Sequence, residues 1–340
     1  MANNRYLIIA PAWIGDMVMS QSLYCLLKQQ QPACHITVIA PGPCADIAHH
    51  MPEIDTVLNW AFPRGKMAFK ARYRAGKSLR HAGYTHAIVL QNSWKSALIP
   101  WAAHIRTKTG YHGEMRYGLL NDRRRLNKLQ LPTMIQRFCA LASSNQHSLP
   151  FDQLPWPTLH INQAQIDQAK THYLGNQATN RPLLILCPGA AYGPAKQWPI
   201  DYFRHLAVAM VQKGWFVLIL GGPNEATIGQ TITDQLDHSL NLAGKTALPD
   251  AMALIRQANH VVSNDSGLMH IACALNRRCT VLYGSSTHTF TPPLSQYATA
   301  LYRTDLTCRP CFQRTCRFGH YHCLTQLSVQ QVLDTIETKK

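Results

Sequence analysis

Short apolar runs alternate with helix-like segments along both halves of the chain. This alternation limits the possible fold classes more than any other feature of the sequence. The strand-like runs are residues 6–11, 35–41, 56–60 and 86–91 in the first half, and 183–187, 215–220, 260–265 and 279–284 in the second. Segments with apolar residues at helical spacing lie between them, for example residues 16–30 and 199–213. Such alternation is typical of parallel sheets covered by helices. The sequence therefore predicts an α/β fold.

The length of 340 residues exceeds what one hydrophobic core usually serves. The alternation pauses once, in a stretch rich in proline and polar residues from Ser143 to Thr158. We therefore predict two Rossmann-like domains, residues 1–155 and 156–340, whose parallel sheets face a central cleft. The sequence leaves open that the last helix packs back on the first domain.

Membrane spans and secretion signals are not apparent in the sequence. No run approaches the roughly 18 apolar residues that cross a bilayer, and the first residues lack the pattern of a signal peptide. We expect a cytoplasmic protein. Its 11 cysteines are an odd number in a large chain, so reduced thiols are expected instead of a disulfide framework.

The net charge of +16 is concentrated in the first half. The segment from Arg64 to Lys128 contains 15 Lys or Arg residues, Lys66 among them, against only Glu114 and Asp122. Such a segment predicts a polyanionic partner, and nucleic acid, anionic lipid headgroups and phosphorylated sugars all fit it. A solvated basic surface without a ligand is the alternative.

One strand end in the second half runs directly into a helix, at Asn264-Asp265-Ser266-Gly267-Leu268-Met269-His270. The free N–H groups and the dipole of a helix start attract phosphate, and Gly267 leaves room for close approach. His270, one turn further on, is positioned to donate to a phosphate or a sugar. A plain helix cap at Asp265 or Ser266 and a hydrogen-bonded core histidine at His270 are the alternatives.

Two further strand ends carry a charged side chain. Lys196 follows a loop of small residues and precedes Pro199, which suits the first position of a helix, so its amine can reach a diphosphate. Glu225 follows Gly221-Gly222, where a carboxylate can accept hydrogen bonds from a ribose. An ordinary surface lysine and a first-turn glutamate are the alternatives.

Asp16 lies between the first expected strand and the first expected helix, in Pro11-Ala12-Trp13-Ile14-Gly15-Asp16. If burial and a ligand move its pKa toward neutrality, it can act as a general base toward an acceptor hydroxyl; otherwise it caps the helix. The G-x-G-x-x-G, P-loop and G-x-S-x-G motifs are absent from the sequence. Their absence argues against Rossmann dehydrogenases, P-loop NTPases and α/β-hydrolases.

Four cysteines near the end of the chain have partly metal-like spacing: Cys308, Cys311, Cys316 and Cys323. Four thiolates suit zinc, but only the first pair has the tight C-x-x-C spacing. Packed free thiols are the alternative. The neighbouring Arg309, Arg314 and Arg317 can serve substrate phosphates in either case.

Six short segments carry a family resemblance. They are residues Trp13 to Leu23, Asn92 to Leu98, Gly113 to Asp122, Gly193 to Lys196, Asn264 to His270 and Phe290 to Ser295. In this order they resemble glycosyltransferase family 9, the lipopolysaccharide heptosyltransferases, over nearly the full chain.

The resemblance implies a GT-B fold, with acceptor binding by residues 1–155 and ADP-heptose binding by residues 156–340. It implies an inverting glycosyltransferase that moves heptose from ADP-L-glycero-D-manno-heptose to the first heptose of the lipopolysaccharide inner core. By the same likeness Asp16 is the catalytic base, and the donor-binding residues are Lys196, Glu225, Asp265, Ser266, Gly267, Leu268 and His270. We expect the acceptor to contact Lys95, Arg116 and Arg123, and we expect no obligatory metal or other cofactor.

The resemblance also gives the basic segment a partner. The acceptor, a Kdo-lipid A core with its first heptose, is anionic, and its lipid implies peripheral contact with the inner face of the inner membrane. One alternative is the same fold acting on another core acceptor, as in the first heptosyl transfer. Another is a basic nucleic-acid-binding module, for which the aromatic RNA-binding motifs are missing.

Overall fold

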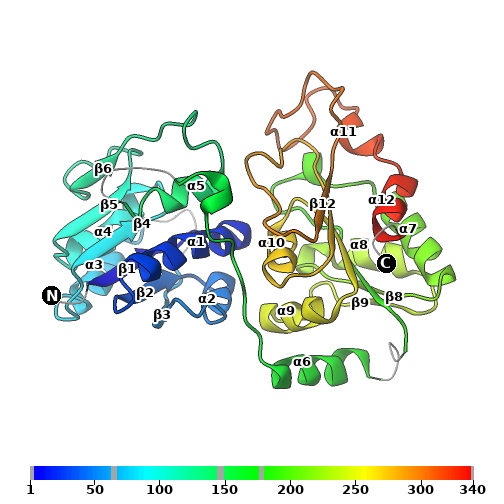
Figure 1. Ribbon diagram of the computed structural model, residues 1–340, viewed down its shortest axis with the longest axis horizontal. Helices are drawn as coiled ribbons and strands as arrows, with labels where there is room; N and C mark the ends of the chain where they lie inside the picture. Colours follow the sequence, from blue (N-terminus) through cyan, green and yellow to red (C-terminus); the bar gives the residue numbers. More distant parts are fainter. Residues whose placement is uncertain (1–3, 63–66, 144–148, 176–179, 338–340) are drawn as a thin grey trace. The chain divides into compact units, whose positions relative to one another are not determined.

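A computed structural model describes residues 4–62, 67–143, 149–175 and 180–337 of the protein (Figure 1). The chain divides into two compact units, Met1–Leu159 and His160–Lys340. The predicted boundary at 155/156 falls a few residues before this division. Residues 144–148, which belong to the predicted connection, lie outside the described residues.

The first unit is a six-stranded parallel sheet with helices on both faces. Its elements are β1 (Arg5–Ile9), α1 (Ile14–Gln30), β2 (His35–Ala40), α2 (Pro43–Ala48), β3 (Thr56–Asn59), α3 (Phe69–Ser78), β4 (His86–Val89), α4 (Trp94–Ala102), β5 (Thr107–Tyr111), β6 (Asp122–Arg124), α5 (Met134–Cys139) and a 3₁₀ turn (Phe151–Gln153). The strand order is β3-β2-β1-β4-β5-β6. Helices α1, α2 and α5 pack together on one face, and α3 packs on α4 on the other (Figure 1).

Close packing in this unit depends on small residues between α3 and α4. A Cβ atom at Gly76 of α3 would lie 2.4 Å from the carbonyl oxygen of Ile99 and 2.7 Å from the Cβ of Ala102 in α4. The apolar face of α4 in turn covers β1 and β4, where Leu7 and Val89 are almost completely buried. The short apolar runs of the sequence thus form the centre of the sheet, as predicted.

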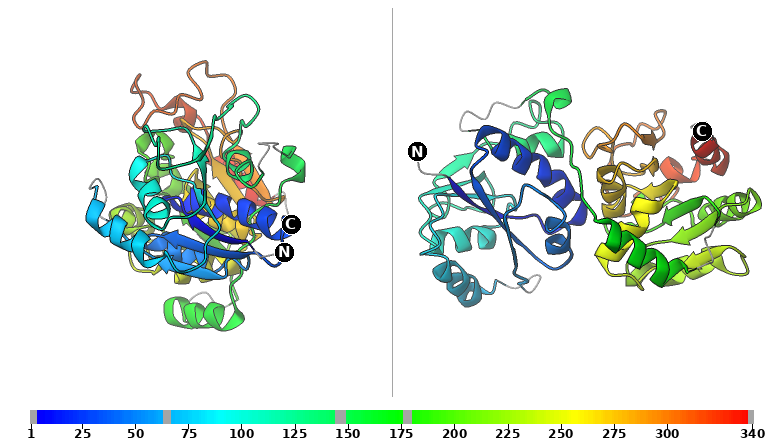
Figure 2. Two further views of the ribbon diagram at one scale, coloured as in Figure 1. Left: turned by 90° about the vertical axis from the view of Figure 1, so that its left-hand side faces the viewer. Right: turned by 60° about the horizontal axis from the view of Figure 1, so that its bottom comes forward.

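The second unit repeats the architecture. Its elements are α6 (Gln163–Ala169), a π-helical turn (Lys170–Leu174), β7 (Leu183–Cys187), a 3₁₀ turn (Pro194–Lys196), α7 (Ile200–Gln212), β8 (Phe216–Ile219), a 3₁₀ turn (Pro223–Glu225), α8 (Ala226–Thr233), β9 (Ser239–Asn241), α9 (Leu248–Gln257), β10 (His260–Asn264), α10 (Gly267–Ala274), β11 (Cys279–Leu282), β12 (Ala298–Leu301), α11 (His322–Thr325) and α12 (Val329–Glu337). All strands are parallel, in the order β12-β11-β10-β7-β8-β9. Helix α7 packs on α8 and α12, whereas α9 packs on α6 and α10 (Figure 2).

The last helix belongs to the second unit. Val332 and Ile336 of α12 share a core with Trp198 and with Phe203 of α7, and α12 also contacts β11. The described residues of α12 thus pack on the sheet of their own unit. Each unit is one continuous stretch of chain.

Both sheets reverse their strand order at one place. In the first sheet the reversal lies between β1 and β4, and in the second between β7 and β10. At such a point the loops at the carboxyl ends of the two strands diverge and leave a crevice, where ligands of open α/β sheets bind. The predicted two Rossmann-like domains are confirmed, and each expected strand is present with its ends within two residues of the expected ones. No described helix is long and apolar enough to cross a bilayer.

Candidate functional site

A buried ion pair marks the reversal point of the second sheet. Lys196 follows β7 and Asp265 follows β10, and the Lys196 Nζ lies 2.5 Å from the Asp265 Oδ2. Their side chains are 16% and 3% exposed. Asn264, fully buried at the end of β10, holds the two loops together, because its amide donates to the Pro188 carbonyl at 2.7 Å and accepts from the Trp198 N–H at 3.0 Å. The structure thus brings together two residues that the sequence placed in one site.

The Asp265 carboxylate has further hydrogen bonds that the sequence analysis missed. The Ser286 hydroxyl donates to its Oδ2 at 2.5 Å, and the Thr291 hydroxyl donates to its Oδ1 at 3.5 Å. Both hydroxyls belong to the segment between β11 and β12. Asp265 is therefore a fixed acceptor at the centre of the site, and it holds the Lys196 amine in place.

The start of α10 lies beside this pair. Ser266, the residue before the helix, is extended and makes no hydrogen bond from its side chain to the N–H groups of the first turn. Gly267 and Leu268, the first two helical residues, are partly exposed. The helix start therefore presents backbone donors and the positive end of a dipole next to a lysine, which is a suitable arrangement for phosphate.

His270 is buried one turn into α10, with 4% of its surface exposed. Burial lowers its pKa to about 4; the nearby Asp265 carboxylate raises this pKa and the Lys196 ammonium lowers it. His270 is therefore neutral at physiological pH. It can offer a phosphate or a sugar a neutral hydrogen bond, but no charge.

Glu225 lies at the neighbouring strand end, after β8. Its Oε2 accepts a hydrogen bond from the Gly222 N–H at 2.7 Å. A Cβ atom at Gly189, in the loop after β7, would lie 2.8 Å from the Glu225 carboxyl carbon. The carboxylate is thus beside the Lys196 loop, at the same edge of the sheet, with room made for it by glycines.

The stretch of residues 303–323, here called the cysteine-rich segment, supports this edge. The Arg309 guanidinium donates to the carbonyls of Gly284 and Ser286 at 2.7 and 2.9 Å. The Cys311 N–H donates to the Ser285 carbonyl at 3.0 Å. The segment therefore fixes the loop that carries Ser286. The sequence had offered only its arginines, Arg309, Arg314 and Arg317, as contacts for substrate phosphates.

The four cysteines of this segment are free thiols of intermediate burial. Burial raises the pKa of Cys316, but backbone N–H groups of residues 318–321 outweigh this effect and lower it. Within the described residues, no three His, Cys, Asp or Glu side chains form a group that could hold a metal ion.

In the first unit, Asp16 and Lys95 follow neighbouring strands at the reversal point. Asp16 is in the first turn of α1 after β1, and Lys95 is in the first turn of α4 after β4; both are partly exposed. The Gln91 amide donates to the Ala10 carbonyl at 2.6 Å and so ties the two strand ends together. Trp13, just before α1, is 51% exposed and was not assigned a role from sequence.

Arg116 has a different role from the predicted acceptor contact. It is 2% exposed, and its guanidinium donates to the Gln91 carbonyl at 2.8 Å, to the Tyr111 carbonyl and to the Asn92 side chain at 3.3 Å. These partners lie just beyond β4 and at the end of β5. The prediction for Arg116 is corrected: its donors hold strand ends in place and are not presented to an acceptor.

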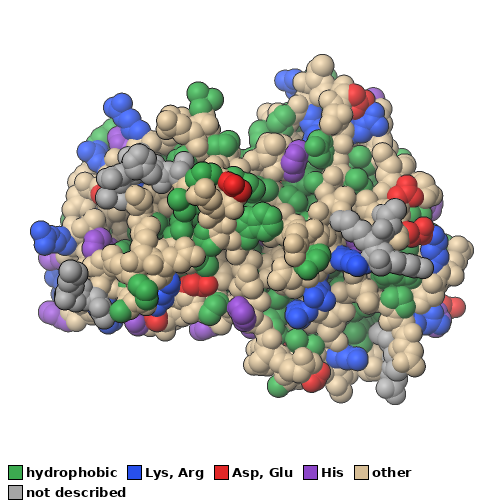
Figure 3. Space-filling model, viewed as in Figure 1, with side chains coloured by type: hydrophobic (Ala, Val, Ile, Leu, Met, Phe, Trp, Pro, Cys, Tyr) green, Lys and Arg blue, Asp and Glu red, His purple; other side chains and the backbone are tan. Residues whose placement is uncertain are grey.

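The basic segment is less uniform than its composition suggested. Arg72 and Arg124 are buried like Arg116; Arg72 lies over the Phe62 ring, and Arg124 is paired with Asp122. Arg123 is exposed and lies over the Tyr117 ring at 4.6 Å. Among the described residues on the face shown in Figure 3, Lys and Arg side chains lie at separate places and not in one continuous patch. Arg64 and Lys66 lie outside the described residues.

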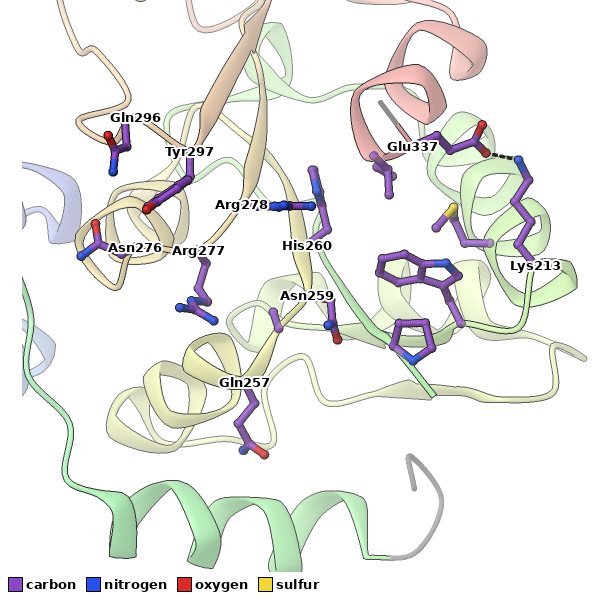
Figure 4. Close-up of a pocket in the computed structure, with 15 residues that line it drawn as sticks. Lys213, Gln257, Asn259, His260, Asn276, Arg277, Arg278, Gln296, Tyr297 and Glu337 are labelled. Atoms are coloured by element: carbon purple, nitrogen blue, oxygen red, sulfur yellow. Dashed lines mark hydrogen bonds and ion pairs between the residues drawn. The ribbon is translucent and has the colours of Figure 1, made fainter. Parts of the chain in front are cut away.

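A hollow of about 1170 Å³ in the second unit lies away from this site (Figure 4). It is lined by His260, Arg278 and Tyr297, among others. These residues precede or begin β10, β11 and β12, so the hollow lies at the amino ends of the strands. Lys196 and Asp265 lie at the carboxyl ends. The hollow is therefore not part of the candidate donor site.

GT-B glycosyltransferases consist of two Rossmann-like domains, and one of the two units described here has an arrangement suited to phosphate at its strand-order reversal. The family model "Glycosyltransferase family 9 (heptosyltransferase)" matches residues 72–322. The chain is 39% identical to lipopolysaccharide heptosyltransferase 2 of Escherichia coli (strain K12), over 98% of this chain and 97% of that protein. It is 44% identical to lipooligosaccharide heptosyltransferase 2 of Haemophilus influenzae, over 87% of each chain.

A solved structure gives the same result. The structure of E. coli ADP-heptose lps heptosyltransferase II superposes with a TM-score of 0.86 at 37% identity, covering 98% of both chains. The chain belongs to glycosyltransferase family 9. It is a glycosyltransferase of the GT-B fold, as the sequence predicted.

Proposed function

We propose that this enzyme transfers heptose from ADP-heptose to the first heptose of the lipopolysaccharide inner core. The observation that carries the proposal is the Lys196–Asp265 pair beside the start of α10, a site suited to a diphosphate. In support, two E. coli proteins, named lipopolysaccharide heptosyltransferase 2 and ADP-heptose lps heptosyltransferase II, align with this chain over almost their whole length. The donor binds in the second unit, with its diphosphate at Lys196 and its nucleoside toward Glu225.

Asp16 supplies the base for the transfer. Its carboxylate accepts the proton of the attacking acceptor hydroxyl, whose oxygen forms a bond to the anomeric carbon of the donor. The bond from that carbon to the diphosphate oxygen breaks with inversion, and its electron pair leaves with ADP. Lys196 and the N–H groups of α10 stabilise the negative charge on ADP. We infer that protein groups of this site, and no metal ion, compensate the charge on the departing ADP.

The reaction is tested with ADP-heptose and purified core that carries one heptose, in the presence of a chelator. The wild type should transfer heptose, and Asp16→Asn should lose at least about 100-fold in kcat, in the range for removal of a general base. Asp46→Asn is the matched control, because Asp46 is also in the first helical turn after a strand of the same sheet, but away from the reversal point.

Three results would contradict the proposal. Transfer only to a heptose-free core would show that the acceptor is not the first heptose. Equal losses of kcat in Asp16→Asn and Asp46→Asn would show that Asp16 is not the base. Activity that disappears with the chelator and returns with a divalent metal would overturn the metal-free mechanism.

The anionic leaflet of a membrane is proposed as the peripheral partner, through α3 and α4. Phe69 and Trp101 are 45% and 39% exposed, and Tyr73 lies between them, at ring-centroid distances of 6.3 and 6.2 Å. Lys70 and Arg74 are exposed on the same helix as Phe69. Aromatic rings at headgroup level and nearby cations both favour an anionic surface.

Vesicle co-sedimentation tests this contact. Trp101→Ser should weaken binding to vesicles with anionic lipid several-fold, whereas Trp156→Ser, at a comparably exposed tryptophan, should not. Equal effects of the two variants, or equal binding to vesicles without anionic lipid, would refute it.

A further inference from the structure

Arg314, in the cysteine-rich segment, is fixed against the loop that carries Lys196. The Ala195 N–H donates to the Arg314 carbonyl at 3.0 Å. Gly193 has a φ of 148°, and a Cβ atom there would lie 2.6 Å from the same carbonyl oxygen. Only glycine allows this approach without strain. The backbone of Arg314 is therefore held one residue away from Lys196.

The Tyr192 ring connects the two cations. Its hydroxyl donates to the Phe312 carbonyl at 2.5 Å, which anchors the ring to the cysteine-rich segment. The Lys196 Nζ lies 5.1 Å from the ring centroid, and the Arg314 Cζ lies 5.5 Å from it. Both are within the usual range of a cation–π contact. The Lys196 and Arg314 cations therefore lie against the same ring, and their separation cannot exceed the sum of their two distances from its centroid.

The two cations differ in what compensates their charge. Lys196 is paired with the buried Asp265 carboxylate, so this pair contributes little net charge to the site. The Arg314 side chain is exposed and lies over the Tyr192 ring. Its planar group of N–H donors is therefore available to a ligand. Both phosphates of a sugar nucleotide are ionised at neutral pH, so a donor there needs more positive charge than the Lys196–Asp265 pair supplies.

We propose that Arg314 is a donor-binding residue that contacts the diphosphate together with Lys196 and the start of α10. This inference rests on the proposed function, because it takes the diphosphate of ADP-heptose as the ligand. The Tyr192 ring pre-orients the guanidinium, which lowers the entropy lost on binding, and a guanidinium can contact phosphate through two parallel hydrogen bonds. The cysteine-rich segment thereby delivers a second side-chain cation to the departing ADP.

Calorimetry with ADP and with adenosine tests this role. Arg314→Gln should weaken ADP binding about tenfold, as expected for a charge-assisted hydrogen bond, and should leave adenosine binding unchanged. Arg314→Lys should restore part of the ADP affinity. The matched control is Arg256→Gln, because Arg256 is an exposed arginine of the same unit in the last turn of α9, just before β10 and therefore at the opposite edge of the sheet from Lys196. The control should bind ADP within about twofold of the wild type.

Several outcomes decide the proposal. Wild-type ADP affinity in Arg314→Gln would overturn it, and so would equal weakening of ADP and adenosine, which indicates a structural role. Pyrophosphate separates the inference from the proposed function. Arg314-dependent pyrophosphate binding without heptose transfer would support Arg314 and reject the function. Heptose transfer with a kcat/KM that Arg314→Gln does not lower would reject Arg314 alone. A wild type that binds neither ADP nor pyrophosphate would reject both.

Discussion

The buried His270 should make the second unit less stable in mild acid. Its pKa is about 4 in the folded protein, mainly because burial penalises the charged form, and close to 6.5 in an unfolded chain. Between these values the unfolded chain binds a proton that the folded protein does not. The stability contribution is therefore complete above about pH 6.5 and is lost as the pH falls to about 4. At about 1.36 kcal/mol per pKa unit, the loss is about 3 kcal/mol.

Urea unfolding of the wild type and of His270→Gln at pH 7.5 and pH 4.5 measures this loss. Between the two conditions the wild type should lose about 2.5 kcal/mol more than the variant, because pH 4.5 still lies above the folded-state pKa and the loss is not complete there. Burial raises the pKa of Asp55 and Asp122, but hydrogen bonds, from the Ile36 N–H and from Arg124 respectively, outweigh it, so both carboxyls titrate below their usual 3.8. The titration of these two carboxyls therefore changes the free energy of unfolding mainly below about pH 4. It does so equally in the wild type and in the variant. The same pH dependence in the two proteins would refute the reasoning.

Three further substitutions test the site and its supports. Lys196→Ala should lower kcat/KM for ADP-heptose about 100-fold, because it removes a group that stabilises the leaving ADP and leaves Asp265 unpaired. Steady-state rates at low donor concentration measure this loss, and a loss below threefold would contradict the prediction. Gly193→Ala should destabilise the fold by about 1–3 kcal/mol through its clash with the Arg314 carbonyl; an unchanged melting temperature would contradict the close approach. Arg116→Met should cost about 3 kcal/mol, because it leaves buried strand-end carbonyls without donors; a denaturant midpoint equal to that of the wild type would show that Arg116 is not a structural residue.

The fold was predictable because the buried strands of a parallel sheet have a simple sequence pattern. Buried strands such as Leu183–Cys187 are continuous apolar runs, and small or turn-forming residues follow them. The positions of the residues predicted to bind the donor were predictable for the same reason, since each of them follows a strand. Lys196 and Asp265 meet because β7 and β10 are neighbours, a pairing that the order of segments in the chain implies for a Rossmann-like sheet.

What the sequence did not predict depends on contacts between distant residues. Arg116 looks like any other arginine of the basic segment, and only the folded strand ends reveal that carbonyl groups surround it. Ser286 and Thr291 are ordinary hydroxyl residues until the segment after β11 brings them to Asp265. The position of Arg314 is set by main-chain hydrogen bonds, which carry no signature of residue type.

The packing of α12 on its own sheet has a consequence for biosynthesis. Because the first unit ends at Leu159 and the described residues of α12 join the core of the second unit, neither unit needs a strand or helix from the other to complete its core. Domains generally fold as units, the amino-terminal one first during synthesis. The first unit can therefore finish folding on the ribosome before β7 has been synthesised. A nascent chain halted beyond the first unit should already contain its six paired strands, protected from proteases.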